Sequence, residues 1–243
     1  MHYWTIMPAA GSSRRMGAGT VPKQYLELAG RSVIECSLAP FLEDETCRGV
    51  LVVLARGDER WARLPIARHP KIETVVGGAE RADSVRAGLS ALRAREDARG
   101  HDWVLVHDAA RPCLTREDLR HLIRELQTDD VGGLLAAPLV DTLKRADASA
   151  RALETVPRAG LWRALTPQMF RLDVLTRALA LAHERGLAVT DEAQAVEVLG
   201  LRPRLVRAAG DNLKITVPED LLRAERILGV PAKRSPRTTG PLT

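Results

Sequence analysis

The sequence predicts an α/β fold, in which one open, mostly parallel sheet carries helices on both faces. Two observations predict it. Short apolar runs alternate with amphipathic stretches along the 243 residues, and this order of elements builds a parallel sheet. In addition, residues 50–55 are apolar throughout, as expected of a strand that is covered on both faces. We therefore expect a Rossmann-like single domain over residues 1–230.

The first half of the chain supplies the opening strands and helices of this fold. Tyr3 to Pro8 is the first predicted strand, and a loop of small residues follows it. Ser32 and Glu35 form a capping box, from which we expect a helix to run to Leu42. The hydrophobic pattern then predicts strands at 50–55, 73–76, 103–107 and 131–140, and helices at 79–92 and 115–126.

The second half of the chain begins with a segment that does not continue the alternation of strands and helices. Residues 141–157 hold two short extended pieces around a polar turn, which predicts a β-arm that protrudes from the sheet. Thr216 and Glu219 are expected to form the capping box of a closing helix. Residues 231–243 are rich in Pro, Arg and Thr, which predicts a basic, disordered tail. The remaining expected elements are helices at 171–185, 191–199 and 218–228, and strands at 205–208 and 213–217.

The composition argues against several classes of function. With 45% hydrophobic and 28% charged residues, the chain is typical of a globular protein. No apolar run approaches the ~18 residues of a membrane helix, and the N-terminus lacks the pattern of a secretory signal. Three scattered cysteines favour a cytoplasmic location. Part of the net charge of +5 lies in the tail and only 3% of residues are aromatic, so nucleic acid is not an expected partner. Without a long apolar run, a membrane is not an expected partner either.

The loop after the first strand is the first candidate site. It reads Pro-Ala-Ala-Gly-Ser-Ser-Arg-Arg-Met-Gly over residues 8–17, and such small residues let backbone N–H groups approach a phosphate. Arg15 and Lys23 would add positive charge. The Gly-Lys-Ser/Thr end of a Walker loop is absent, and Ser13 interrupts a dinucleotide fingerprint. The alternative is an ordinary loop of small residues.

Two further candidates also follow predicted strands. Asp108 and Arg111 lie just past the strand at 103–107, where they could hold a metal-bound phosphate and a second anion, or form a simple surface ion pair. Gly78 could bring the backbone against a planar base, and Ser84 could donate a hydrogen bond to it. The alternative for this segment is a solvated helix start.

Taken together, these stretches resemble the family of 2-C-methyl-D-erythritol 4-phosphate cytidylyltransferases, of the non-mevalonate isoprenoid pathway. The resemblance extends from Thr5 to Leu228. It implies a magnesium-dependent homodimer that joins CTP to 2-C-methyl-D-erythritol 4-phosphate and releases pyrophosphate. It rests on the strings PAAGSSRRM, PKQYL, GGAERADSV, VLVHDAARP, PLVDTLKR, GLWRALTPQ, TDEAQA and NLKITVPEDL.

The resemblance also implies a role for individual residues on the nucleotide side of the site. Asp108 would lie near the ribose and hold Mg²⁺, with Asp211 behind it. The cations of the phosphate site would be Arg15, Lys23 and Lys214, and the backbone loop around CTP would be Ala9, Ala10 and Gly11. The cytosine contacts would be Gly78 and Ser84.

On the acceptor side, the resemblance implies contacts with the methylerythritol phosphate. Arg111, Thr166 and Thr190 would lie near this second substrate, while Thr142 and Arg158 would come from an arm of the neighbouring subunit. The sequence departs from the family pattern at Ser13, at Ala79, and in a spacing from Met16 to Lys23 that is one residue longer, so we expect local loop geometry to differ there.

The reaction that the resemblance implies needs no general base. A phosphate monoester has a second pKa of about 6 and is mostly dianionic near neutrality. Positioning and fixed positive charge must therefore supply the rate. Two alternatives stay open: a related nucleotidyltransferase with another acceptor, such as ribitol 5-phosphate or a sugar 1-phosphate with UTP, and a non-catalytic nucleotide-binding module.

Overall fold

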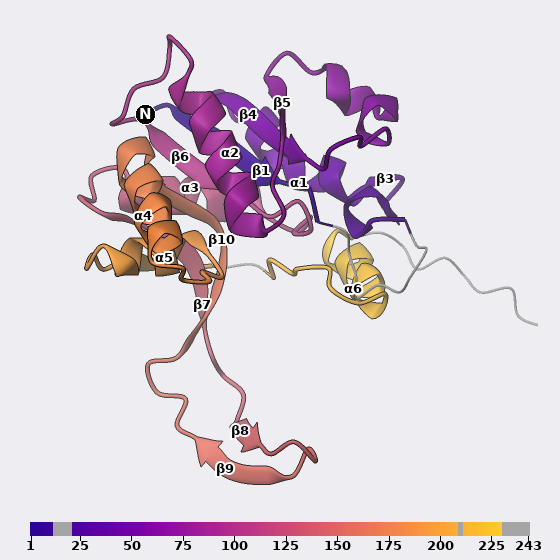
Figure 1. Cartoon of the computed structure of the whole chain (residues 1–243). Helices are drawn as coiled ribbons and strands as arrows, with labels where there is room; N and C mark the ends of the chain where they lie inside the picture. The colour runs from indigo at the N-terminus through magenta and orange to yellow at the C-terminus, as the bar shows by residue number, and fades with distance from the viewer. Residues whose placement is uncertain (12–20, 209–210, 230–243) are drawn as a thin grey trace, which may run out of the picture.

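The first strand lies near the middle of a seven-stranded sheet. A computed structural model describes residues 1–11, 21–208 and 211–229 of the chain. The strand order is β11-β7-β10-β6-β1-β4-β5 (Figure 1). The strands of this sheet are β1 (Tyr3–Pro8), β4 (Cys47–Leu54), β5 (Ile72–Val76), β6 (Trp103–Val106), β7 (Gly132–Pro138), β10 (Trp162–Arg171) and β11 (Arg204–Arg207).

Most neighbouring strands run parallel, as the sequence predicts. β1 pairs in parallel with β4 and β6, and the pairs β4–β5 and β7–β11 are parallel too. Only β10 is antiparallel to both of its neighbours, β6 and β7. The expected open, mostly parallel sheet is therefore confirmed, with one strand inserted in the opposite direction.

Helices cover both faces of the sheet, because successive side chains of each strand point to opposite sides. Along β1, Tyr3 and Met7 pack in a cluster with α1 and α3, whereas Trp4 and Ile6 pack in another with α2, α4 and α5. Figure 1 shows α2 and α4 in front of the strands. The helices are α1 (Val33–Leu42), α2 (Arg81–Arg93), α3 (Arg116–Leu126), α4 (Leu172–Glu184), α5 (Glu192–Val198) and α6 (Glu219–Ile227).

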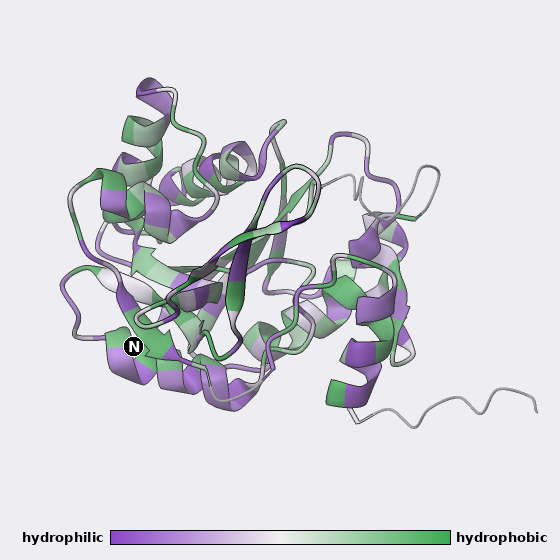
Figure 2. Ribbon diagram, turned by 90° about the horizontal axis from the view of Figure 1, so that it is seen from below, coloured by the Kyte–Doolittle hydropathy of each residue, from purple (hydrophilic) through white to green (hydrophobic). Residues whose placement is uncertain are grey.

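The helices are amphipathic, and their sequence signals begin them where expected. In Figure 2 they carry hydrophilic and hydrophobic residues side by side, as helices that bury one face do. The Ser32–Glu35 capping box is present at α1, where both Ser32 N and Ser32 Oγ donate to Glu35 Oε2. In the part of the chain that the structure covers, no helix is long and apolar enough to cross a membrane.

Short elements connect the sheet to the rest of the fold. A third apolar cluster joins α6, through Ala224, to Leu28 and Ile215, and so fixes the segment before α6 against the body. The short elements are the paired strands β2 (Glu27–Leu28) and β3 (Arg31–Ser32), and the 3-10 helices Lys23–Tyr25, Trp61–Arg63 and Pro65–Arg68.

Three sequence expectations need correction. Strand β10 was not expected, because Pro167 lies within it and proline disfavours an internal strand position. Around this proline, the pairing of β10 with β7 is irregular between Ala164 and Gln168. The strand expected at 213–217 is wrong: that segment is extended and reaches the body through Ile215 N, which donates to Ala110 O at 2.8 Å.

The third correction concerns the start of the closing helix. The carboxylate that accepts from the backbone N–H groups of Thr216 and Val217 belongs to Asp220, at 2.9 and 3.1 Å, so the Thr216–Glu219 capping box is wrong. The helix itself is present, and its first helical residue is Glu219.

The expected β-arm is present as an antiparallel hairpin of β8 (Leu143–Ala146) and β9 (Ala152–Val156). Figure 1 shows it projecting away from the sheet beyond the end of β7. Two large apolar side chains, Val140 at its base and Leu153 on β9, are 73% and 64% exposed. The arm therefore presents apolar surface that the body of its own chain does not cover.

Candidate active site

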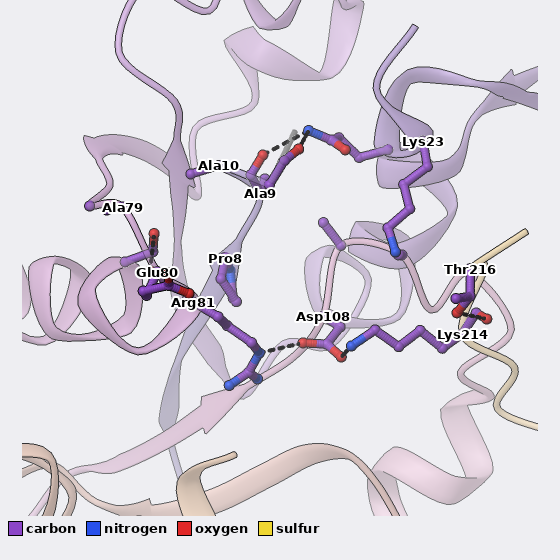
Figure 3. A pocket seen from close by; sticks show the side chains of 16 residues that line it. Pro8, Ala9, Ala10, Lys23, Ala79, Glu80, Arg81, Asp108, Lys214 and Thr216 are labelled. Atoms are coloured by element: carbon purple, nitrogen blue, oxygen red, sulfur yellow. Dashed lines mark hydrogen bonds and ion pairs between the residues drawn. The ribbon is translucent and has the colours of Figure 1, made fainter. Parts of the chain in front are cut away.

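A cavity of about 350 Å³ opens at the carboxyl ends of β1 and β6, where parallel strands place their ligands. Five segments line it (Figure 3). They are the loop after β1 (8–11), the 3-10 helix with Lys23 and Gln24, the start of α2 (78–81 and Ser84), the loop after β6 (108–110), and the segment before α6 with Lys214 and Thr216.

The loop after β1 is held in place from both sides. Ala9 N donates to Val53 O at 2.8 Å, and the buried Gln24 side chain donates from Nε2 to Ala9 O at 2.8 Å and to Gly11 O at 3.4 Å. Gln24 was not assigned a role from the sequence, although it stands in the PKQYL string. Its amide occupies the loop carbonyls, which favours a loop whose N–H groups face a ligand.

The glycines before α2 are required by close packing against the first turn of that helix. A Cβ at Gly77 would lie 2.7 Å from Ser84 Oγ, and one at Gly78 would lie 2.4 Å from Asp83 Cβ. Ser84 Oγ donates to Glu80 O at 3.2 Å. Gly78, Ala79 and Ser84 all line the cavity, so the backbone here is open to a flat ligand.

Asp108 is the carboxylate at the centre of the site. Its Oδ1 accepts from Arg81 Nε at 2.9 Å, and its Oδ2 lies 2.8 Å from Lys214 Nζ and 3.6 Å from Arg111 Nε. Figure 3 shows the Arg81 and Lys214 side chains reaching it from opposite sides. Burial alone would raise the pKa of Asp108, but Arg81, Lys214 and Arg111 outweigh it and hold the pKa far below its usual range.

Arg81 and Glu192 were missed by sequence reasoning. Arg81 donates from Nη1 to Glu192 Oε1 at 2.6 Å and from Nη2 to Glu192 Oε2 at 3.0 Å, while its Nε serves Asp108. Burial lowers the pKa of Arg81, yet Glu192 and Asp108 raise it well above its usual value. Both residues stand in strings that carried the resemblance, but no local pattern predicts a pair that is 111 positions apart.

A buried hydrogen-bond relay supports Asp108 from beneath. His107 Nε2 lies 3.1 Å from Arg111 O, a carbonyl that can only accept, so this nitrogen carries the proton. Nδ1 therefore accepts from Thr166 Oγ1 at 2.9 Å, and the same hydroxyl accepts from Asp108 N at 3.2 Å. Burial lowers the pKa of His107 to about 4, which keeps the ring neutral.

Two residues predicted to contact the acceptor, Thr166 and Arg111, belong instead to the buried hydrogen-bond network around His107 and Asp108. Thr166 is buried with its hydroxyl proton directed at His107, and Arg111 donates from Nη1 to Asn212 O at 2.8 Å. Neither is among the described residues that line the cavity, and the same holds for Asp211. A contact of Thr166 or Arg111 with substrate stays a prediction.

The two predicted lysines reach the cavity from opposite ends of the chain. Lys23 Nζ donates to Ile215 O at 2.8 Å, and Lys214 pairs with Asp108. Their ammonium groups line the same space as Ala9, Ala10 and Gly11. Arg15, the third expected cation, lies outside the described residues, as do Ser13 and most of the longer spacing before Lys23.

The other acceptor-side residues are not brought together within one chain. Thr142 is exposed just before β8, and Arg158 is exposed after β9, where Nη1 donates to Val140 O. Thr190 lies before α5 with Oγ1 donating to Gln194 Oε1 at 3.1 Å, next to a second, more open hollow. None of the three lines the cavity that holds Lys23 and Lys214, as far as the chain is described.

Comparison with known proteins places this chain in a family. Residues 3–230 match the model of the family described as IspD, 2-C-methyl-D-erythritol 4-phosphate cytidylyltransferase. The chain belongs to this family. The resemblance predicted from the sequence is confirmed, and with it the assignment to the nucleotidyltransferases of the isoprenoid pathway.

Relatives and solved structures of the IspD family agree over nearly the whole chain. The 2-C-methyl-D-erythritol 4-phosphate cytidylyltransferase of Pseudomonas paraeruginosa is 56% identical over 225 residues, which are 92% of this chain and 95% of that protein. A solved 4-diphosphocytidyl-2C-methyl-D-erythritol synthase shares 38% identity with a TM-score of 0.81, over 93% of this chain and 98% of that one. The Francisella tularensis IspD structure shares 30% identity with a TM-score of 0.80, over 93% of this chain and 100% of that one.

Proposed function

We propose that this chain joins CTP and 2-C-methyl-D-erythritol 4-phosphate to give 4-diphosphocytidyl-2-C-methyl-D-erythritol and pyrophosphate. The supporting observation is a cavity at the carboxyl ends of β1 and β6 that gathers Lys23, Lys214 and a loop of small residues, in a chain that matches this family over residues 3–230. Clustered ammonium and backbone N–H groups suit a triphosphate.

The chemistry requires charge stabilisation rather than proton transfer. An oxygen of the acceptor phosphate attacks the α-phosphorus of CTP, and the bond from that phosphorus to the bridging oxygen breaks, so pyrophosphate leaves with the electron pair. The attacking monoester is already mostly dianionic near neutrality, since its second pKa is about 6. Among the described residues that line the cavity there is no histidine and no cysteine, and a reaction without a general base needs none.

The lining residues divide into a phosphate side and a base side. Lys23 and Lys214 would neutralise the charge that builds up on the α-phosphate and on the leaving pyrophosphate, assisted by Arg15. The backbone N–H groups of Ala10 and Gly11 would hold the phosphates, while Ala9 is fixed to Val53 and Gln24 at the start of this loop. The backbone at Gly78 and the hydroxyl of Ser84 would bind the cytosine.

The donor set also fits a magnesium ion at Asp108. Two carboxylate oxygens offer about four lone-pair positions, of which Arg81 Nε and Lys214 Nζ take one each. Mg²⁺ is commonly held by one or two carboxylates with phosphate oxygens and water. Asp108 lines the cavity beside Lys214, so it is the residue that would hold the ion. When bound, Mg²⁺ would supply positive charge to the phosphates.

We further propose that the working unit is a homodimer with shared sites. Thr142 and Arg158 lie at the two ends of the exposed arm, outside the cavity of their own chain, and the arm presents the apolar side chains of Val140 and Leu153. A symmetric pair would cover this surface and carry each arm to the partner's cavity. Acceptor binding would then depend on the partner subunit's arm.

Subunit mixing tests the shared site. Lys23→Ala and Arg158→Ala should each be nearly inactive alone. Refolded together, they should form about half heterodimers, in which one site carries both lesions and the other carries none, so activity should return to about a quarter of wild type. If both residues serve one chain's own site, every site keeps a lesion and mixing restores nothing.

Pyrophosphate release tests the reaction itself. Release should require CTP, 2-C-methyl-D-erythritol 4-phosphate and Mg²⁺ together, with each omitted in turn as a control. Ribitol 5-phosphate as acceptor and UTP as donor should give little turnover. Equal turnover with ribitol 5-phosphate would move the chain to the related activity, and no turnover with any pair would contradict the proposed reaction.

Two coarser proposals concern the whole chain. We infer a cytoplasmic location, because all three cysteines, Cys36, Cys47 and Cys113, are free and buried, which suits a reducing compartment. We also infer that residues 1–230 act as one catalytic domain with the arm as an appendage.

A further inference from the structure

We propose that Arg81 and Glu192 are positioning residues, which orient the Asp108 carboxylate and thereby the Lys214 ammonium in the cavity. The inference rests on the proposed function, because it concerns the same site. Arg81 lines the cavity and binds Asp108 directly, whereas Glu192 does not line it and acts only through Arg81.

The guanidinium geometry makes this pair directional. Glu192 engages both Nη atoms in a fork at 2.6 and 3.0 Å, which fixes the plane of the group and aims the remaining Nε–H at Asp108 Oδ1, 2.9 Å away. With Oδ1 occupied, Oδ2 is left to face Lys214 at 2.8 Å. A lysine at position 81 would have no such fork and could not set the plane of the carboxylate.

Glu192 is itself held rigidly at the start of α5. Its side chain is only 1% exposed. The buried Gln168 on β10 accepts from Ala193 N at 2.7 Å and donates from Nε2 to Asp191 Oδ2 at 3.0 Å, and Asp191 caps the helix by accepting from Gln194 N at 2.9 Å. The first turn of α5 is thus tied to the same strand that supplies Thr166 beneath Asp108.

A purely stabilising role explains these contacts less well. Burying ion pairs is costly, and well-packed apolar residues of similar size often serve stability equally well. Helix α2 already has an exposed link to α4, where Arg93 Nη1 pairs with Asp173. What an apolar pair could not provide is a fixed direction for the Asp108 carboxylate.

Substitution at both positions separates positioning from stability. In R81M/E192M the charges are removed together, so the melting temperature should stay close to wild type. The kcat/KM for CTP should still fall by about 10–100-fold, the usual effect of losing a partner that orients a functional group. R93M/D173M is the matched control: it removes both charges of an ion pair between α2 and α4 outside the cavity, and both quantities should stay near wild type.

Glu192→Gln provides a second, milder variant that keeps the size of the side chain. Its single acceptor oxygen cannot engage both Nη atoms, so Arg81 should turn away from Asp108. The Kd for CTP with Mg²⁺, measured by calorimetry without acceptor, should rise by about tenfold, and kcat/KM should fall at least as far. Glu192 does not line the cavity, so a direct substrate contact would not explain such a loss.

The outcomes decide the proposal. Wild-type kcat/KM in a folded R81M/E192M, or an unchanged Kd and kcat/KM in E192Q, would overturn it. Because the binding measurement omits the acceptor, it still tests positioning if the wild-type chain fails to use 2-C-methyl-D-erythritol 4-phosphate. That failure would count against the proposed reaction alone.

Discussion

Acidification should weaken the fold through one imidazole, that of His107. The ring is fully buried beneath Asp108, and its two nitrogens are engaged by Thr166 Oγ1 and Arg111 O. Protonation would put a proton on Nδ1, where the ring now accepts from Thr166. His107 therefore binds a proton less readily in the folded protein than in the unfolded chain.

The size and sign of the effect follow from the pKa of His107, which burial lowers from 6.5 to about 4. A folded pKa below the unfolded one means that the contribution to stability is complete above the unfolded pKa and declines as the pH falls toward the folded one. The complete loss of this contribution lowers the free energy of unfolding by about 3 kcal/mol, of which about 2 kcal/mol is lost by about pH 5. Asp108, with its lowered pKa, loses its contribution only at still lower pH, so this window reports on His107.

Urea unfolding of wild type and His107→Gln, at intervals between about pH 7 and about pH 5, measures this loss. The variant should be less stable near neutrality, since it breaks the relay to Thr166. Its stability should then fall less with acidification, so that the difference between the two proteins shrinks by about 2 kcal/mol. A difference that stays constant over this range would refute the account of His107 as a buried neutral base.

Two further predictions concern residues that line the cavity. Lys23→Ala should lower kcat by about 10²–10³, as for loss of one electrostatic contact to the transition state, whereas Lys71→Ala should not, although Lys71 also donates to a backbone carbonyl at 2.7 Å. Steady-state pyrophosphate release measures both, and equal rates for the two variants would contradict the role of Lys23. Gln24→Glu places a carboxylate against the carbonyls of Ala9 and Gly11, so the loop should shift and the KM for CTP should rise by about tenfold or more; an unchanged KM would show that the loop does not depend on this contact.

Local signals in the sequence predicted most of the fold. The Ser32–Glu35 capping box and the apolar run of β4 are both found as expected, because short-range hydrogen bonding and burial determine them. Strand β10 has no such signal: it contains Pro167 and is stabilised by strands on either side that lie far away in the sequence. The segment at 213–217 is extended without a partner strand, which a residue pattern cannot distinguish from β-structure.

The candidate site also contains residues that the sequence predicted and residues that it did not. Lys23, Asp108 and Lys214 lie in recognisable strings, and all three line the cavity. Arg81 and Glu192 meet only in the folded chain, where the first residue of α2 reaches the first residue of α5, and nothing in either string indicates the other. The acceptor-side residues on the arm lie outside the cavity of their own chain, and their contact with substrate stays a prediction.

The pairing of Lys214 with Asp108 leads to one further prediction, on Asp108→Asn. In the absence of substrate, the Lys214 ammonium lies 2.8 Å from a carboxylate oxygen of Asp108, so a polyanion that binds Lys214 must first break this ion pair. A hydrogen bond between charged groups contributes about 1.5–3 kcal/mol. Without that carboxylate, pyrophosphate should bind about tenfold more tightly when Mg²⁺ is excluded by a chelator, which is equivalent to about 1.4 kcal/mol.

Turnover of the same variant should fall, because tighter binding of the leaving group slows its release and adds nothing to the transition state alone. Calorimetry with pyrophosphate and a chelator measures the first effect, and initial rates with Mg²⁺ measure the second. The melting temperature is recorded alongside, since the buried Arg111 loses its carboxylate neighbour as well. Weaker or unchanged pyrophosphate binding in a folded Asp108→Asn would mean that Asp108 does not hold Lys214 back from the phosphates.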